Sequence, residues 1–311
     1  MQALRYASYG PPSVLRIDAV AEPRPGRAQA RVEVRAAALN PKDVLERKGK
    51  LRWAGARGLP RVPGYDFAGV MLDALGDLPA GARVFGMRNG MGGGACAQVL
   101  CADADEVAPC PADLDFAAAA SLPLAGQTAL QALRDLLKVR PGDAVLINGA
   151  SGGVGTLAVQ IAAALGATVT GVCSTRNLKL IEDLGASTAL DYTAGDVLAG
   201  PARYDALFDC FGSMPWARAK AALKSGGRFC TALPKPTALI HEALARVDLH
   251  RGRLVVVRSR RADLDQLAAW VADGRLRPAV DRILPWTEAA EAHTYVETRR
   301  ARGKVVLTIG D

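Results

Sequence analysis

Hydrophobic and polar positions follow two different patterns along the chain, and the change comes near Phe116. Before that point, short hydrophobic runs typical of strands alternate with stretches rich in Pro and Gly. The predicted strands cover residues 3–7, 15–20, 30–37, 69–72 and 98–101. Short strands at this spacing predict a small β-barrel or β-sandwich.

After that point, helical and strand-like patterns alternate. Residues 117–139 are rich in Ala and Leu at helical spacing and predict two helices that meet near residues 123–126. The strands predicted next are 144–148, 168–173, 187–190, 206–209, 228–232 and 254–257, with helices at 154–165, 178–184 and 215–223. Continuously apolar strands alternating with helices predict a parallel sheet covered on both faces.

The last part of the chain no longer alternates in this way. Helices are predicted at 264–273 and 288–298 and a final strand at 304–309, which we expect to return to the first domain. The predicted domains are therefore residues 1–120 plus 262–311, and residues 121–261.

Composition narrows the class of protein. With 311 residues, 50% hydrophobic and 23% charged, the chain can form a sizeable core. The six cysteines include no C-x-x-C pair and no targeting segment is visible, so we expect free thiols and a cytoplasmic protein.

The net charge of +8 is dispersed, which favours a solvated surface or an anionic cofactor over nucleic acid. The apolar run 157–173 is interrupted by Gln160, Gly166 and Thr168, so no membrane span is expected.

The most informative segment joins the strand 144–148 to the following helix. It reads Gly149-Ala150-Ser151-Gly152-Gly153-Val154-Gly155. Glycines allow a tight turn and a close approach of the backbone to a diphosphate, and the start of a helix offers free N–H groups. Ala150 replaces the first glycine of the usual pattern, but the strand–turn–helix–strand context predicts dinucleotide binding. The alternative is an ordinary turn with incidental glycines.

The end of the second strand predicts which dinucleotide binds. NAD sites place an acidic side chain there, but no Asp or Glu occurs between Asp143 and Glu182. Ser174, Arg176 and Lys179 stand there instead, and a hydroxyl with two cations suits a 2′-phosphate. We therefore expect NADPH, although Ser174 could be only a helix cap and the two cations only solvated surface.

Several motifs resemble the zinc-independent quinone oxidoreductase branch of the medium-chain dehydrogenase/reductase superfamily. They span nearly the whole chain in the expected order: residues 38–43 (ALNPKD), 63–69 (PGYDFAG), 83–86 (RVFG), 122–130 (LPLAGQTAL), 149–155, 171–177 (GVCSTRN) and 302–306 (RGKVV). The resemblance implies a Rossmann doubly wound parallel sheet domain plus a GroES-like β-barrel domain. It also implies a homodimer that uses NADPH to reduce quinones or the C=C bond of α,β-unsaturated carbonyl compounds.

The resemblance also bears on metal binding. Zinc-dependent members of the superfamily carry Cys at the position of Asn40 and a His-Glu pair at Tyr65 and Asp66. This chain has no His before residue 241 and nothing similar to the four-Cys lobe. Zinc prefers N and S ligands in tetrahedral sites, so we expect no metal.

Two residues are candidates for catalysis. Asn40 could donate to a substrate oxygen or to the nicotinamide ribose, and Tyr65 could donate from its phenol. Asn40 could instead be only a turn residue before proline, and Tyr65 could simply pack in the interior.

The candidate cofactor-binding residues come from the turn, from strand ends and from the resemblance. They are Asn40, Thr128, Ser151, Gly152, Gly153, Val154, Ser174, Arg176, Lys179, Tyr192, Phe211 and Leu233. Thr128 resembles a cofactor-contacting Thr of the family but could be an ordinary helix cap, and Tyr192 resembles a residue near the 2′-phosphate. Phe211 and Leu233 follow strand ends, where ligands bind in parallel sheets.

The resulting hypothesis is an NADPH-dependent, metal-free quinone or enone reductase with no nucleic-acid or membrane partner. The alternatives are a nucleotide-binding scaffold or sensor without turnover and, less favoured, an alcohol dehydrogenase. Gln127 and Cys96 replace an apolar residue and a Tyr that are usual in the family, and both are expected to alter the substrate pocket.

Overall fold

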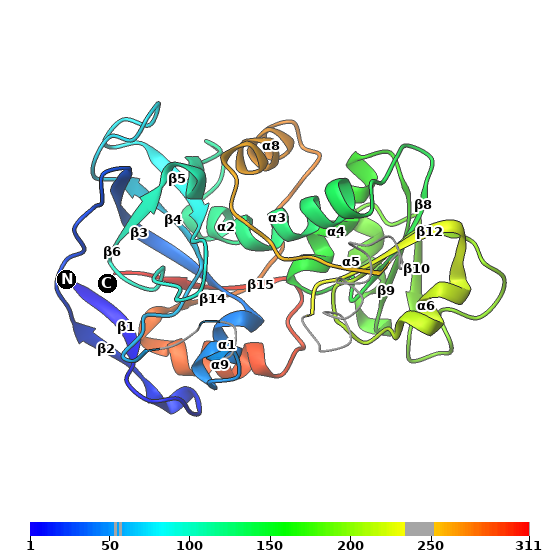
Figure 1. Cartoon of the computed structure of the whole chain (residues 1–311), viewed down its shortest axis with the longest axis horizontal. Coiled ribbons are helices and arrows are strands. Elements are labelled where there is room, and N and C mark those ends of the chain that lie inside the picture. Colours follow the sequence, from blue (N-terminus) through cyan, green and yellow to red (C-terminus); the bar gives the residue numbers. More distant parts are fainter. Residues whose placement is uncertain (53–54, 56–57, 234–251, 311) are drawn as a thin grey trace. The chain divides into compact units, whose positions relative to one another are not determined.

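The computed structural model describes residues 1–52, 55, 58–233 and 252–310 and forms two compact units (Figure 1). The first unit consists of Met1–Gln127, Arg258–Gly274 and Pro278–Asp311. The second consists of Thr128–Val257 with the short piece Arg275–Arg277. The first unit is thus completed by the end of the chain.

The first unit is built on a seven-stranded sheet with the strand order β14-β15-β3-β4-β5-β7, in which β6 also pairs with β3. The strands are β3 (Gln29–Leu39), β4 (Asp66–Met71), β5 (Arg83–Met87), β6 (Val99–Asp103), β7 (Val107–Pro109), β14 (Val280–Pro285) and β15 (Lys304–Thr308). The final strand β15 runs antiparallel to β3, so the end of the chain lies in the sheet of the first unit. A separate antiparallel pair is formed by β1 (Gln2–Tyr6) and β2 (Leu15–Ala19).

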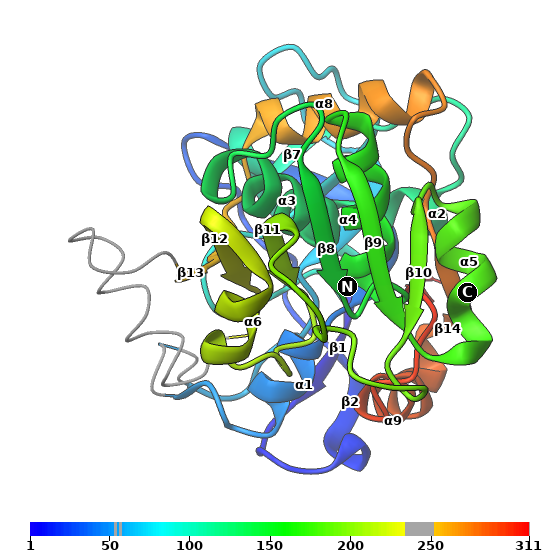
Figure 2. The same cartoon turned by 90° about the vertical axis from the view of Figure 1, so that its right-hand side faces the viewer.

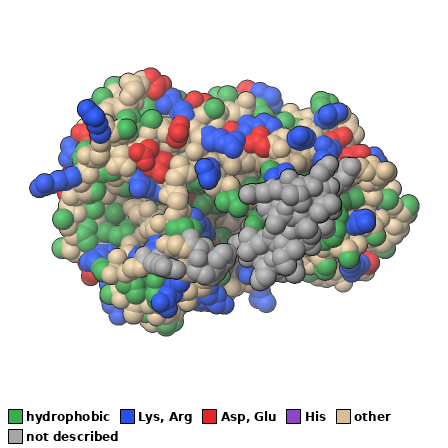
Figure 3. All heavy atoms as spheres, in the orientation of Figure 1, with side chains coloured by type: hydrophobic (Ala, Val, Ile, Leu, Met, Phe, Trp, Pro, Cys, Tyr) green, Lys and Arg blue, Asp and Glu red, His purple; other side chains and the backbone are tan. Residues whose placement is uncertain are grey.

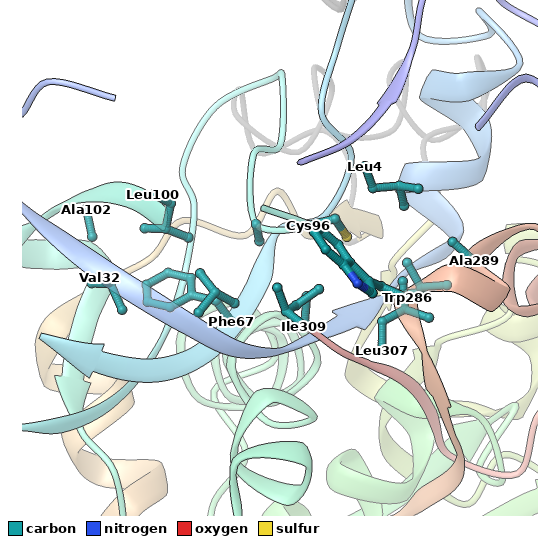
Figure 4. Packing of buried hydrophobic residues seen from close by; sticks show 14 of the residues in the cluster. Leu4, Val32, Phe67, Cys96, Leu100, Ala102, Trp286, Ala289, Leu307 and Ile309 are labelled. Carbon is teal, nitrogen blue, oxygen red and sulfur yellow. The ribbon is translucent and has the colours of Figure 1, made fainter. Parts of the chain in front are cut away.

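The core of this unit follows from period-two alternation along the strands. In β3, Ala30, Val32 and Val34 are buried, while the residues between them are partly exposed. Figure 4 shows side chains of this hydrophobic cluster, with Val32 near Phe67 and Trp286 among its members. The helices of the unit are α1 (Pro41–Arg47), α2 (Phe116–Ala120), α8 (Arg261–Ala272) and α9 (Ala289–Glu297), with short 3-10 turns η1 (Pro12–Val14), η3 (Ala104–Glu106) and η6 (Trp286–Glu288).

The second unit contains a six-stranded sheet in which every neighbouring pair is parallel. Its order is β10-β9-β8-β11-β12-β13, from β8 (Ala144–Asn148), β9 (Thr168–Cys173), β10 (Thr188–Asp191), β11 (Tyr204–Asp209), β12 (Leu223–Thr231) and β13 (Gly252–Leu254). The order of β10, β9, β8, β11 and β12 can be followed in Figure 2. This is the Rossmann order 3-2-1-4-5-6, which confirms the predicted fold and places the switch point between β8 and β11.

Helices connect the strands of this sheet. They are α4 (Gly153–Ala164), α5 (Leu178–Asp183) and α6 (Trp216–Ala222), with the 3-10 turn η5 (Thr175–Asn177) before α5. The predicted helical stretch 117–139 is divided into α2, α3 (Pro123–Leu130) and a π-helical turn, η4 (Gln131–Leu136). The prediction of two helices there is therefore incomplete.

Some elements were not predicted from the pattern. The strands β5, β7 and β14 and the helix α1 are short or mix buried and exposed residues without a regular period. β14, for example, exposes Arg282 and Ile283 in succession, so alternation gives no signal. The segment 234–251, which includes His241 and His250, lies outside the described residues.

One face of the molecule agrees with the dispersed charge of the sequence. On the face shown in Figure 3, Lys and Arg side chains are interspersed with Asp and Glu. Within the described ranges, no helix is long and apolar enough to cross a membrane.

Candidate functional site

The glycine-rich turn follows β8 at the carboxyl edge of the parallel sheet. Gly149 has φ +75°, and a Cβ there would lie 2.9 Å from Cβ of Phe211. A Cβ on Gly155 would lie 2.1 Å from the carbonyl oxygen of Gly149, so only glycine allows α4 to begin this close to the strand. Both glycines are therefore required for the chain to fold, whether or not a ligand binds.

Gly152 differs from these two glycines. Its φ of −84° suits any residue, and the nearest atom to an added Cβ is the Gly149 oxygen at 3.5 Å. The fold therefore leaves the space beside Gly152 open. This is the cradle that a diphosphate needs, and it is the fit expected for a dinucleotide.

The start of α4 supplies donors to this cradle. The amide of Thr156 donates to the carbonyl of Gly152 at 2.9 Å, and helix geometry leaves the amides of Gly153 and Val154 without helical acceptors. Ala150, which replaces the first glycine, is buried, and its amide donates to the Val172 carbonyl at 2.9 Å. Ala150 thus ties the turn to β9, and its methyl group does not close the cradle.

A polar cluster lies where β8 and β9 end. Asn177 is 4% exposed, and its Nδ2 donates to Oγ of Ser151 at 2.9 Å and to Oγ of Ser174 at 3.3 Å. The structure thus brings together two predicted cofactor residues that are far apart in the sequence. Asn177 itself was missed, because no local pattern links it to Ser151, 26 residues earlier.

The predicted 2′-phosphate residues are exposed. Arg176 and Lys179 both lie on the surface, and Lys179 pairs with Asp183 one turn along α5. Tyr192 is 60% exposed, and its amide donates to the Cys173 carbonyl at the end of β9.

An acidic residue that is not among the predicted cofactor residues lies at the end of β10. Asp191 accepts from the hydroxyl of Thr175 and from both the amide and the hydroxyl of Thr193. These hydrogen bonds lower the pKa of Asp191. The carboxylate is therefore held by local threonines.

The switch point of the sheet is fixed by buried hydrogen bonds. Asp209, at the end of β11, accepts from Nδ2 of Asn148 at 2.7 Å and from the amides of Gly212 and Met214. Phe211 is 45% exposed beside Gly149, and a Cβ on Gly212 would lie 2.5 Å from Cβ of Leu233. The structure therefore brings Phe211 and Leu233 to the same edge as the glycine turn.

Thr128 is the remaining predicted residue of this unit. It is buried within α3 rather than at its start. The alternative that Thr128 caps the helix is therefore wrong.

In the first unit, Asn40 belongs to a buried ionic cluster. The Lys304 ammonium donates to Oδ1 of Asn40 at 2.6 Å and to Oδ2 of Asp66 at 2.9 Å, and Asn40 Nδ2 donates to the same carboxylate oxygen at 2.9 Å. All three residues are at most 4% exposed. Strand register explains the meeting, since Ala38 of β3 pairs with Asp66 of β4, and Leu39 pairs with Val305 of β15.

Asp43 lies next to this cluster. Its carboxylate accepts from the amides of Asn40 and Gly64, both at 2.8 Å. Burial raises the pKa of Asp43 to about 7. The neighbouring Lys42 donates to the Gly90 carbonyl and lies over the Tyr65 ring.

Tyr65 is buried and its hydroxyl is fully used. The hydroxyl donates to Glu46 and accepts from the amide of Gly92 at 3.0 Å. Burial, together with the nearby Glu46 carboxylate, raises the pKa of Tyr65. In this arrangement, the hydroxyl proton points to a protein acceptor.

The two residues that depart from the family pattern, Gln127 and Cys96, both lie in the interior of the first unit. Gln127 is buried, and its amide group binds Ser259 and the amide of Arg260, where the chain re-enters the first unit. Cys96 is buried in the hydrophobic cluster of Figure 4. Both side chains are therefore occupied by the packing of the first unit.

A metal site would need several ligating side chains close together. In the part of the chain that the structure describes, no group of three or more His, Cys, Asp or Glu side chains could hold a metal ion.

Comparison with known proteins agrees with the fold. Residues 26–112 match the alcohol dehydrogenase GroES-like domain, and residues 184–307 match the zinc-binding dehydrogenase domain. The chain is 34% identical to the NADPH-dependent alkenal/one oxidoreductase of Arabidopsis thaliana, over 99% of this chain and 79% of that protein. It is 30% identical to a chloroplast envelope quinone oxidoreductase homolog of the same plant, over 99% and 98% of the two chains.

Solved structures give the same result. The quinone oxidoreductase from Coxiella burnetii is 33% identical with a TM-score of 0.90, covering 100% of this chain and 99% of that one. A mycobacterial protein solved in complex with NADPH is 26% identical with a TM-score of 0.80, covering 99% of each chain. The chain belongs to the quinone oxidoreductase branch of the medium-chain dehydrogenase/reductase superfamily.

Proposed function

We propose that this protein is an NADPH-dependent, zinc-independent oxidoreductase that reduces quinones or the C=C bond of α,β-unsaturated carbonyl compounds. The observation that carries the proposal is the open cradle at Gly152, beside the start of α4 and the switch point of a Rossmann sheet. The names of the relatives, which include alkenal/one and quinone oxidoreductases, support the substrate class.

The residues around the cradle have distinct roles in this proposal. Gly152, Gly153, Val154 and Ser151 hold the diphosphate; Ser174, Arg176, Lys179 and Tyr192 hold the 2′-phosphate; Thr128, Phe211 and Leu233 line the rest of the dinucleotide site. When bound, NADPH supplies the hydride. We retain residues 121–261 as the cofactor domain and 1–120 plus 262–311 as the catalytic domain.

The buried ionic cluster supports zinc independence. Asp66 is already paired with the Lys304 ammonium, and Oδ1 of Asn40 accepts from the same ammonium. A divalent cation at these oxygens would be repelled by Lys304. Asn40 is held in place by Lys304 and Asp66. We propose that this fixed position is what Asn40 contributes to the binding of substrate or of the nicotinamide ribose. Tyr65 is the second catalytic candidate. Its hydroxyl donates to Glu46, and the substitution Tyr65→Phe tests whether it also donates a proton to the substrate.

The proposal extends to assembly and location. A homodimer is supported by β13, which is the edge strand of the second sheet among the described residues, and by Val256 nearby, which is 72% exposed. A cytoplasmic location remains the expectation from the sequence.

Steady-state assays test the function directly. Purified protein should oxidise NADPH in the presence of a panel of quinones or a panel of enones, and elemental analysis should find less than stoichiometric zinc. Tight NADPH binding without turnover on either panel would favour a scaffold or sensor. Stoichiometric zinc together with alcohol oxidation would favour an alcohol dehydrogenase.

A further inference from the structure

Asn177 connects the glycine turn after β8 to the end of β9. Its side chain is buried, and both of its short polar contacts go to serine hydroxyls: Ser151 in the turn and Ser174 at the strand end. Asn177 ends the 3-10 turn η5, and its own amide donates to the Ser174 carbonyl at 2.8 Å. This hydrogen bond fixes the main chain at the junction, and the contacts with the two serine hydroxyls hold the side chain there.

The direction of these hydrogen bonds determines what the serines can do. A hydroxyl that accepts from an amide still has its own hydrogen to donate. Within the described residues, the hydroxyls of Ser151 and Ser174 donate to no protein acceptor. Both serines are only partly buried, so these hydrogens remain available to a ligand.

The carbonyl oxygen of the Asn177 side chain gives a second argument for ligand binding. Oδ1 of Asn177 is buried and has no hydrogen-bond partner in the described part of the chain. A buried polar atom without a partner destabilises the folded state, because it has lost its hydrogen bonds to water. Such destabilisation is expected where the Nδ2 half of the same amide performs a function.

We propose that Asn177 is a positioning residue for the cofactor. Its amide turns the hydroxyl hydrogens of Ser151 and Ser174 outward, so that Ser151 donates to the diphosphate and Ser174 donates to the 2′-phosphate. This role rests on the proposed NADPH function and adds to it a residue that need not touch the cofactor. Hydrogen bonds to charged groups are stronger than those to neutral groups, so aimed hydroxyls contribute measurably to affinity.

Binding measurements on two variants test this role. In Asn177→Ala the hydroxyls lose their orientation, and we expect the Kd for NADPH to rise about tenfold. In Asn177→Asp the nearly isosteric carboxylate accepts from both hydroxyls and adds a negative charge, and we expect a rise of about a hundredfold. Isothermal titration with NADPH, NADH and adenosine 2′,5′-bisphosphate should show a smaller effect, about threefold, on NADH in the Ala variant.

A double-mutant cycle separates positioning from a structural role. In a Ser151→Ala/Ser174→Ala background, Asn177→Ala should leave the Kd for NADPH unchanged, since there are no hydroxyls left to orient. The same tenfold loss in that background, or an equal loss for NADPH and NADH, would overturn the role. Should Asn177→Ala fail to fold in thermal melts, the Asp variant tests the same role, since it keeps the shape of the side chain.

The failure of this inference differs from that of the proposed function. Wild-type affinity for NADPH in Asn177→Ala and Asn177→Asp overturns the positioning role alone. Wild-type protein that takes up neither pyridine nucleotide overturns the proposed function, and the role of Asn177 with it.

Discussion

The glycine turn of the second unit and the ionic cluster of the first unit represent two different uses of polar groups. Around Gly152 the protein leaves space and donors that no described protein atom fills, whereas Asn40, Asp66 and Lys304 satisfy one another in the interior. Open polar groups indicate a ligand, and closed ones indicate architecture. Cofactor binding by the glycine turn is therefore better supported than catalysis by Asn40 or Tyr65.

The largest expected effect is on cofactor binding, from Gly152→Val. The valine side chain fits the free protein but occupies the diphosphate cradle, so we expect NADPH affinity to fall at least about a thousandfold with little change in Tm. Titration calorimetry and thermal melts measure the two quantities.

Gly155→Ala is the matched control for that experiment. Its Cβ would lie 2.1 Å from the Gly149 oxygen, so we expect a loss of about 3 kcal/mol or more in stability. Equal losses of stability in Gly152→Val and Gly155→Ala would contradict the distinction between an open and a closed glycine.

The next largest effect concerns the closed cluster. Lys304→Met leaves the buried Asp66 carboxylate without its cation, and we expect a loss of about 3–5 kcal/mol in the free energy of unfolding. Urea denaturation measures it. The matched control is Lys224→Met, since Lys224 forms an exposed pair with Asp205 and should cost less than about 1 kcal/mol. Similar losses in both variants would show that the buried pair has no special role.

The first unit should also lose stability in mild acid because of His293. This side chain is fully buried with both ring nitrogens unpartnered among the described residues, and burial, with Arg47 nearby, lowers its pKa to about 3. The unfolded chain binds a proton below about pH 6.5 while the folded chain does not, so stability present above pH 6.5 falls as the pH approaches 3. We expect a loss of about 2 kcal/mol at pH 5, which His293→Leu should abolish in urea titrations across this range. A wild-type loss that persists in His293→Leu would assign it to other groups.

A smaller effect is expected at the predicted 2′-phosphate site. Replacing Arg176 and Lys179 together with Ala should raise the KM for NADPH about tenfold and leave that for NADH within about twofold, because only NADPH carries the 2′-phosphate. Steady-state kinetics with both nucleotides measures this. Equal changes for the two nucleotides would refute the assignment.

The smallest effect on activity is expected from Tyr65→Phe. Since the Tyr65 hydroxyl already donates to Glu46, its removal should cost about 1–3 kcal/mol of stability but change kcat by no more than about threefold. A fall in kcat of about a hundredfold or more, with Tm unchanged, would instead show that Tyr65 donates a proton to the substrate.

The pattern of apolar residues predicted the second unit better than the first. Strands β8 and β9 have the predicted bounds, because buried parallel strands are continuous apolar runs between glycine turns. β14 was not predicted, because a partly exposed strand at the edge of a sheet has no regular period. The glycine turn was recognised from sequence because its residues are contiguous.

Local patterns and short motifs were therefore enough to predict the fold class, the Rossmann turn and the family. Which polar groups are satisfied and which remain open could be read only from the folded chain. Strand register joins Asn40 to Lys304 across 264 positions, and the turn of η5 brings Asn177 to Ser151. Such contacts depend on packing between distant segments, and no local pattern of residues records them.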